Sequence, residues 1–237
     1  MSGVRVLGAG LAGCEAALWL ADKGVPVELV EQKPARKSPA HKSENFAELV
    51  CSNSLKADRP DSASGLLKAE MDLLGSHLLP VARRVRVAAG GALAVDRDAF
   101  SAGVTALVES QPNITVVRKE AVCLDESLPT LVATGPLTDG PLADAIAEVT
   151  GGDELSFYDA AAPIVTAESL DMSRIFAASR YGRGDADYLN CPFNKEEYEA
   201  FHAALVSAQR AELHAFDGDL TVYEGCMPIE VMASRGA

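Results

Sequence analysis

A glycine-rich turn near the start of the chain limits its fold more than any other feature. Residues 8–13 have the spacing G-x-G-x-x-G and come directly after a short β-rich run at residues 4–7. Residues 11–23 follow as an uninterrupted series of helix formers, and residues 25–30 have the composition of a second strand. The pattern predicts a strand–helix–strand unit with parallel strands and a right-handed crossover.

The residue types in this turn are those that a dinucleotide site needs. The first glycine permits a tight turn, the second a close approach of the backbone to a pyrophosphate, and the third close packing of helix on strand. Backbone N–H groups at the start of the helix then face the phosphates. Glu31 ends the second strand, where a carboxylate accepts hydrogen bonds from ribose hydroxyls. The predicted cofactor-binding residues are Gly8, Ala9, Gly10, Leu11, Ala12, Gly13 and Glu31. The alternative is a plain strand–helix turn without a ligand.

A second glycine element favours FAD over NAD. Residues 131–135 read Leu-Val-Ala-Thr-Gly, and a strand that ends in Ala-Thr-Gly resembles the second glycine-containing element of FAD-binding domains. Thr134 and Gly135 therefore join the predicted cofactor site. The predicted fold class is α/β, with a Rossmann-like FAD-binding domain of the two-dinucleotide-binding-domain flavoprotein type.

The rest of the chain predicts two domains. A change of texture near residue 151 suggests an FAD-binding portion at 1–150 and part of an inserted α+β domain at 151–237. Asp96 is placed to cap a helix that runs to about residue 110, and Asn194 forms a capping box with Glu197. Other predicted helices are 63–74 and 142–149, predicted strands are 92–95, 114–118, 129–133 and 156–165, and predicted loops are 32–45 and 176–187.

Composition excludes several classes of function. The net charge of −13 over 237 residues does not suggest a general nucleic-acid binder, although a local basic patch remains compatible with it. The five cysteines are scattered, and no signal peptide is recognisable, which predicts reduced thiols and a cytoplasmic location. No Cys or His spacing suggests a metal site, and no apolar run is long enough to span a membrane.

Two cysteines lie in unusual company. Cys51 stands in Glu-Leu-Val-Cys-Ser-Asn-Ser, and Cys226 stands in Glu-Gly-Cys-Met-Pro at a turn before a possible helix. A thiolate near a helix N-terminus has a lowered pKa and is a better nucleophile. The competing interpretation is burial, because free cysteine is among the most buried residue types. Cys14, Cys123 and Cys191 are predicted to be structural, with Cys123 in a strand-like run.

Taken in order along nearly the whole chain, these and other segments resemble a known family. The segments are LGAGLAG (7–13), AHKSENFAELVCSNSLKA (40–57), GLLKAEM (65–71), GGALAVDRD (90–98), ATGPL (133–137), FYDAAAPIVT (157–166), YLNCPF (188–193) and EGCMPIEVMA (224–233). The chain is similar to the N-terminal half of the folate- and FAD-dependent tRNA (uracil-5-)-methyltransferases, which are small relatives of the glucose-inhibited-division flavoproteins. The two cysteine segments and the 157–166 segment are more specific than the glycine turn.

The resemblance implies a reaction. The family takes a methylene group from 5,10-methylenetetrahydrofolate, reduces it with flavin and NAD(P)H, and places a methyl group on C5 of the T-loop uridine of tRNA. The family's cysteine in Glu-Gly-Cys-Met-Pro falls on Cys226, to which the resemblance assigns attack on uracil C6. The other family cysteine falls on Cys51, to which it assigns proton transfer or a second thiol role. The two roles are interchangeable at this stage.

Family members are roughly twice as long as this chain. The chain is therefore expected to be a fragment, with uncertain activity alone and an open sheet edge that favours self-association. One alternative is the same chemistry on a ribosomal RNA uridine, and another is an FAD-binding remnant without catalysis. A simple FAD or NAD oxidoreductase is a further alternative, but it would not need Cys51 and Cys226.

Overall fold

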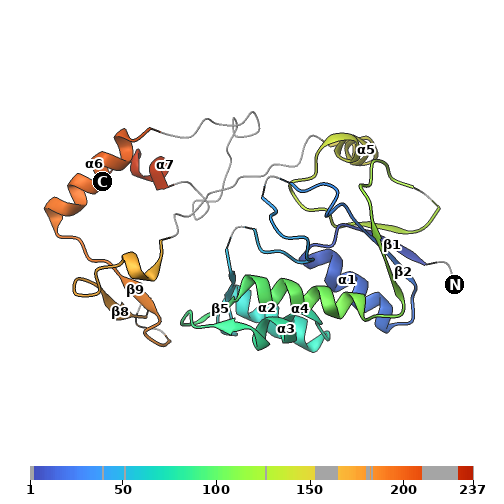
Figure 1. Cartoon of the computed structure of the whole chain (residues 1–237), viewed down its shortest axis with the longest axis horizontal. Coiled ribbons are helices and arrows are strands. Elements are labelled where there is room, and N and C mark those ends of the chain that lie inside the picture. The colour runs from blue at the N-terminus through green and yellow to red at the C-terminus, as the bar shows by residue number, and fades with distance from the viewer. Residues whose placement is uncertain are drawn as a thin grey trace. The chain divides into compact units, whose positions relative to one another are not determined.

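The computed structural model describes residues 3–38, 40–50, 52–125, 127–152, 165–179, 182, 184–209 and 229–236. The chain divides into two compact units, Met1–Leu155 and Ser156–Ala237 (Figure 1). The first unit contains the glycine turn, the main sheet and the helices that cover the two faces of this sheet. In the described part of the chain, every helix is too short or too polar to cross a membrane.

The first unit is built on a four-stranded parallel sheet with the strand order β6-β2-β1-β7. These strands are β1 (Val4–Leu7), β2 (Val27–Glu31), β6 (Ile114–Arg118) and β7 (Thr130–Val132). Helix α1 (Leu11–Asp22) connects β1 to β2, as the sequence predicts. The carboxyl ends of β1, β2 and β7 therefore lie side by side, since Leu7 pairs with both Val30 and Val132.

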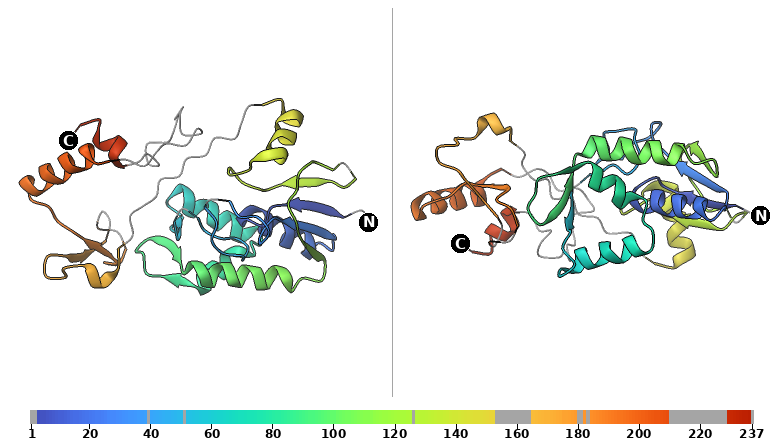
Figure 2. Two further views of the ribbon diagram at one scale, coloured as in Figure 1. Left: turned by 45° about the horizontal axis from the view of Figure 1, so that its top comes forward. Right: turned by 90° about the horizontal axis from the view of Figure 1, so that it is seen from below.

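Helices cover both faces of this sheet (Figures 1 and 2). On one face, α1, α3 (Leu78–Arg84) and α4 (Arg97–Glu109) enclose the main core, which includes the fully buried side chains of Leu18, Leu29 and Val104. On the other face, Leu142 of α5 (Gly140–Thr150) packs with Leu7 and Val30. Coverage on both faces is the arrangement expected of a parallel sheet and confirms the predicted α/β class.

A small antiparallel sheet with the order β3-β5-β4 completes the first unit. Its strands are β3 (Ser54–Ala57), β5 (Ala92–Val95) and β4 (Arg86–Val87). Only β5 was predicted from the sequence. Strand β4 has two residues and β3 has four, which is too short for a regular alternation of polar and apolar residues to be recognised in the sequence. Strand β3 is also irregular, because Lys56 within it has a positive φ of 68°.

Helix boundaries follow the predicted capping residues. Asp96 accepts a hydrogen bond from the backbone N–H of Ala99 at 2.9 Å and begins α4. Asn194 and Glu197 form a reciprocal capping box at the start of α6 (Lys195–Ser207). Both caps satisfy N–H groups that have no partner inside the helix.

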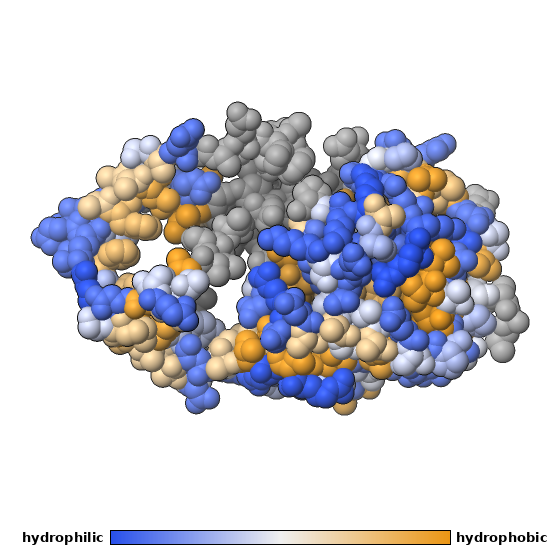
Figure 3. Space-filling view, in the orientation of Figure 1, coloured by the Kyte–Doolittle hydropathy of each residue, from blue (hydrophilic) through white to orange (hydrophobic). Residues whose placement is uncertain are grey.

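The α2 helix (Ala63–Leu73) presents an apolar face to solvent. Leu66 and Leu67 are half exposed, and Leu73 is 90% exposed. In Figure 3, hydrophobic surface interrupts the hydrophilic surface on the side of the first unit where α2, α3 and α4 lie. Of the described residues of α2, only Gly65 and Lys68 are buried, so this helix packs through a narrow strip.

The second unit has local contacts of its own. Strands β8 (Phe176–Ala178) and β9 (Tyr188–Asn190) form an antiparallel pair. The prediction of a loop at 176–187 was wrong for its first three residues, because these residues pair with Tyr188–Asn190, a contact distant in sequence. The unit also contains the short 3-10 helix Ala167–Ser169 and α7 (Ile229–Ala233) beside α6, where His202 Nε2 lies 2.9 Å from the carbonyl oxygen of Ala233. The predicted strand at 156–165 lies outside the described residues except for residue 165.

Candidate cofactor site

The glycine turn has the backbone geometry that its sequence predicts. Gly8 has a φ of 93°, and a Cβ atom there would lie 2.7 Å from the carbonyl oxygen of Ala133. A Cβ atom on Gly13 would overlap the carbonyl oxygen of Gly8, which is why the helix can pack so closely on the strand. A Cβ atom on Gly10 would meet nothing nearer than 4.0 Å. Protein packing thus requires the first and third glycines, whereas the space at Gly10 is open.

Glu31 is fixed at the end of β2. Its side chain is buried, and its two oxygens accept hydrogen bonds from the backbone N–H groups of Ala9 and Lys33, both at 2.9 Å. The carboxylate therefore connects the glycine turn to the loop that follows β2. Each carboxylate oxygen can accept more than one hydrogen bond, so Glu31 retains capacity for a hydroxyl donor.

The start of α1 is open to an anion. Helices α2, α4 and α6 begin with side-chain caps from Ser62, Asp96 and Asn194. In contrast, α1 begins at Gly10 without a side-chain cap and has no acidic residue in its first turn. No side chain of the cap or of the first turn therefore neutralises the partial positive charge of this helix end, and of the N–H groups in the glycine turn, the carboxylate of Glu31 accepts only from the adjoining one of Ala9.

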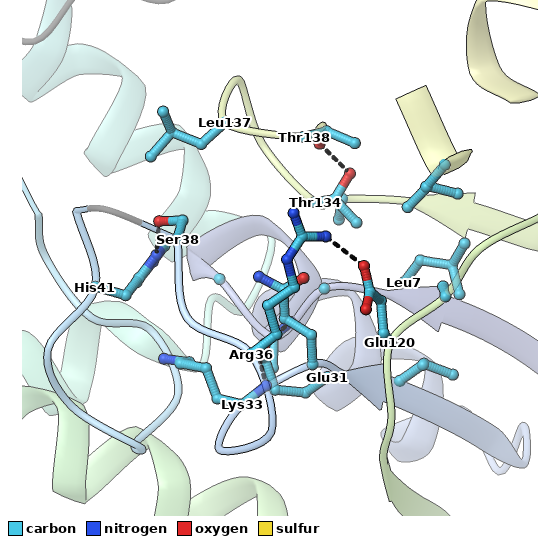
Figure 4. Close-up of a pocket in the computed structure, with 18 of the residues that line it drawn as sticks. Leu7, Glu31, Lys33, Arg36, Ser38, His41, Glu120, Thr134, Leu137 and Thr138 are labelled. Carbon is cyan, nitrogen blue, oxygen red and sulfur yellow. Dashed lines mark hydrogen bonds and ion pairs between the residues drawn. The ribbon is translucent and has the colours of Figure 1, made fainter. Parts of the chain in front are cut away.

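A pocket lies at the carboxyl ends of β1, β2 and β7 (Figure 4). It brings together five of the predicted residues: Gly8, Ala9, Gly10, Glu31 and Thr134. The side chains of Thr134 and Thr138 are joined by a hydrogen bond of 2.6 Å at one wall. The other predicted residues are not part of the pocket lining, and these are Leu11, Ala12, Gly13 and Gly135.

Sequence reasoning missed a group of charged residues in this pocket. The Arg36 guanidinium donates hydrogen bonds to Glu120 and, at 2.7 Å, to Asp139. The carboxylates of Glu120 and Asp139 raise the pKa of Arg36 further above its already high value. These three residues come from three separate loops, so the sequence held no spacing signal for them. The one indication of these contacts in the sequence was a cationic residue, Arg36, in the polar loop after Glu31.

A buried group of charges adjoins the pocket. Lys33 is 4% exposed, donates to the carbonyl oxygen of Asn45, and lies 3.7 Å from Glu48 Oε2. His41 Nδ1 is 2.6 Å from Ser38 Oγ. Burial lowers the pKa of His41, and the nearby charge of Lys33 lowers it further, which favours the neutral imidazole. The segment 32–45 was predicted as an ordinary loop, but Lys33, His41 and the nearby Glu48 all line the pocket.

The structure describes three of the five cysteines, Cys14, Cys123 and Cys191. Cys51 and Cys226 lie outside the described residues. Cys14, which was predicted to be structural, is buried and donates a hydrogen bond to the carbonyl oxygen of Ala9 at 3.3 Å. Cys123 and Cys191 are exposed, and Cys123 lies in a bend after β6 instead of a strand. Burial thus supports a structural role for Cys14 but not for Cys123 or Cys191.

Cys14 is expected to resist alkylation in the folded protein. Burial, and secondarily the negative charge of Glu31, raise the pKa of its thiol to about 12, so almost no thiolate exists at pH 8. Cys123 and Cys191 are solvent accessible. Brief iodoacetamide treatment followed by peptide mass spectrometry is therefore expected to modify Cys123 and Cys191 while leaving Cys14 intact. Modification of Cys14 at the same rate as the other two would contradict this packing, and unfolded protein provides the control in which all three react.

The fold and the pocket define a Rossmann-like domain of the flavoprotein type, with its glycine turn, its parallel sheet and a carboxylate at the end of the second strand. Residues 3–237 match the family described as Glucose inhibited division protein A, and the chain belongs to this family.

Curated relatives agree with this assignment. The chain is 57% identical to methylenetetrahydrofolate–tRNA-(uracil-5-)-methyltransferase TrmFO of Moorella thermoacetica, over 98% of this chain and 53% of that protein. It is 54% identical to the protein of the same name from Acetivibrio thermocellus, over the same shares. The family resemblance predicted from the sequence is thereby confirmed. The chain spans about half the length of the curated relatives that it matches.

Among solved structures, Aquifex aeolicus GidA matches with 17% identity and a TM-score of 0.43, over 55% of this chain and 24% of that chain.

Proposed function

We propose that the first unit holds FAD in the pocket at the glycine turn. The observation that carries this proposal is the pairing of an open space at Gly10 with a buried carboxylate, Glu31, anchored beside it. The residues proposed to bind the cofactor are Gly8, Ala9, Gly10, Leu11, Ala12, Gly13, Glu31, Thr134 and Gly135.

The residues present suit the chemistry of this cofactor. A pyrophosphate at Gly10 would face the uncapped start of α1, which favours an anion. Glu31 would accept hydrogen bonds from ribose hydroxyls while it holds the backbone of Ala9. Thr134, held by Thr138, adds a hydroxyl at the end of β7. Leu11, Ala12 and Gly13 act through the backbone and packing of α1 and do not line the pocket.

The relatives' names support a reaction for the whole protein: transfer of a one-carbon unit from 5,10-methylenetetrahydrofolate to C5 of a uridine in tRNA. We propose the T-loop uridine as the target and NAD(P)H as the reductant. When bound, FAD supplies the reducing chemistry that converts a methylene to a methyl group. Because the chain spans about half of its relatives' length, we assign to it the FAD pocket and two cysteines, not the complete reaction.

Two cysteines are proposed for the covalent chemistry on the RNA. The thiolate of Cys226 adds to uracil C6, so that C5 becomes enolate-like and attacks the one-carbon unit. Cys51 removes the proton from C5, and the bond between the one-carbon unit and the nitrogen of its carrier breaks, with bound FAD as the group that would supply the two electrons for reduction to a methyl group. The bond between Cys226 and C6 also breaks, and the uracil ring regains its double bond. We propose that this reaction takes place in the cytoplasm. We also propose that residues 1–150 form the FAD-binding domain and that residues 151–237 form part of an inserted domain.

The first test is a visible absorbance spectrum of the purified chain after incubation with FAD and desalting. Retained flavin bands are the expected result. A protein that stays colourless, while circular dichroism shows it to be folded, would refute FAD binding by this chain. An incubation with FAD and excess NAD as a competitor is the comparison, and NAD is expected not to reduce the retained flavin bands, because the second glycine element favours FAD.

The cysteine roles predict a trapped covalent complex. RNA carrying 5-fluorouridine at the target position blocks proton removal from C5, so the adduct through C6 accumulates. Denaturing gel electrophoresis is expected to show this adduct with the unchanged protein and with Cys51→Ala, but not with Cys226→Ala. An undiminished adduct in Cys226→Ala would mean either that Cys226 and Cys51 have the opposite roles or that neither assignment holds. A ribosomal RNA fragment that carries 5-fluorouridine tests the alternative substrate, because an adduct with this fragment would indicate the same chemistry on ribosomal RNA.

A further inference from the structure

Glu48 is fixed in place with one oxygen unused. Its Oε1 atom accepts hydrogen bonds from the backbone N–H groups of Lys42 at 2.9 Å and Ser43 at 3.0 Å. Its Oε2 atom is buried and accepts none, and no other buried side-chain oxygen or nitrogen in the described residues lacks a partner in this way. Burying an unpaired acceptor is costly, and more so when it is charged.

The nearby ammonium group does not satisfy this oxygen. Lys33 Nζ is 3.7 Å from Glu48 Oε2, which is beyond hydrogen-bond range, and it donates instead to the carbonyl oxygen of Asn45. Burial raises the pKa of Glu48, but the two backbone N–H donors, followed by the charge of Lys33, outweigh burial and lower it overall. The carboxylate is therefore ionised at neutral pH and can act as an acceptor only.

The residue that carries the unused oxygen belongs to the wall of the cofactor pocket. Glu48 lines the same pocket as Gly8, Gly10 and Glu31. The segment that carries it is fastened to the glycine turn, because the N–H of Ala47 donates to the carbonyl oxygen of Ala9 at 2.9 Å. A ligand whose pyrophosphate lies at the turn would therefore have its adjoining groups near Glu48.

We propose that Glu48 Oε2 accepts a hydrogen bond from a hydroxyl group of the bound dinucleotide, an inference that rests on the proposed FAD function. A carboxylate repels the phosphates, so it must face a donor. In FAD, the pyrophosphate is flanked by the adenosine ribose on one side and the ribityl chain on the other. The donors that adjoin the glycine turn are therefore hydroxyls, from one of these two sources.

Isosteric replacement tests this role. Glu48→Gln keeps the shape of the side chain and removes the charge, and Glu48→Asp keeps the charge but withdraws the oxygen from the pocket. Both variants are expected to raise the dissociation constant for FAD about tenfold or more, as loss of a hydrogen bond to a charged group does. Flavin fluorescence titration measures this, with Glu44→Gln as a matched control, because Glu44 lies in the same segment and is exposed.

The same variants separate the two hydroxyl sources and the competing explanation. ADP contains the ribose but lacks the ribityl chain, so a loss of affinity for both ADP and FAD identifies the ribose, whereas a loss for FAD alone identifies the ribityl chain. Unchanged FAD affinity in either variant, with native circular dichroism, would overturn the inference and leave Glu48 as a counter-charge to Lys33. If the unchanged protein binds no FAD, the proposed function fails, and this inference fails with it.

Discussion

Gly13→Ala is expected to lower the free energy of unfolding by about 3 kcal/mol or more and to remove FAD binding. The added Cβ atom would overlap the carbonyl oxygen of Gly8, which is backbone and cannot turn away as a side chain would. Relief requires α1 to move off β1. That movement would loosen a core in which Cys14 and Leu18 of α1 are fully buried, and it would displace the N–H groups that face the phosphates.

Gly10→Ala is the matched control for this prediction. A methyl group at Gly10 meets no protein atom nearer than 4.0 Å, and the φ of −74° there suits alanine, so stability is expected to stay unchanged. The same methyl group fills the space proposed for the pyrophosphate, so FAD binding is expected to be lost. Urea unfolding of both proteins without ligand, together with flavin titration, measures the two effects. Equal stability of Gly13→Ala and the unchanged protein would show that the helix does not pack as described.

Local sequence signals were sufficient for one half of the pocket. The glycine turn, the strand before it and Glu31 lie within one strand–helix–strand unit, where short-range sterics and capping determine the backbone. Thr134 was also predicted, because it ends a strand with a recognisable Ala-Thr-Gly sequence. In each case the information lies within a few residues of the site.

The other half of the pocket depends on contacts that no short segment encodes. Arg36 meets Glu120 and Asp139 only because parallel pairing brings the loops after β2 and β6 to the same edge of the sheet as the start of α5. Lys33 and Glu48 are polar residues in an irregular segment, which favours a solvated loop when the sequence is considered alone. Their burial follows from the docking of Phe46 and Ala47 into the main core.

Long-range contacts also explain the errors elsewhere. Phe176–Ala178 becomes a strand only through its pairing with Tyr188–Asn190. The run around Cys123 has strand-like composition but pairs with no strand in the part of the chain that the structure describes. Propensity decides where a strand can form, and pairing decides whether it does.

Glu31→Ala is expected to destabilise the protein by about 2–5 kcal/mol, because two buried N–H groups, those of Ala9 and Lys33, lose their only carboxylate acceptor. The turn and the loop after β2 would no longer be held together. FAD affinity is expected to fall further than stability alone explains, since the ribose would lose its acceptor as well. The stability of Glu31→Gln is expected to lie between those of Glu31→Ala and the unchanged protein, because its amide oxygen can still accept a hydrogen bond from one of the two N–H groups.

Glu28→Ala provides the control, because Glu28 lies on the same strand but its side chain is 32% exposed. Its ion pair with Arg5, at 2.5 Å, is partly solvated, and such pairs contribute about 0–1 kcal/mol. Urea unfolding in the absence of FAD, followed by flavin titration of each variant, separates stability from binding. Should Glu31→Ala unfold at the same urea concentration as Glu28→Ala, the carboxylate does not hold the glycine turn. Should it lose stability yet bind FAD normally, Glu31 supports the fold and has no part in recognising the ribose.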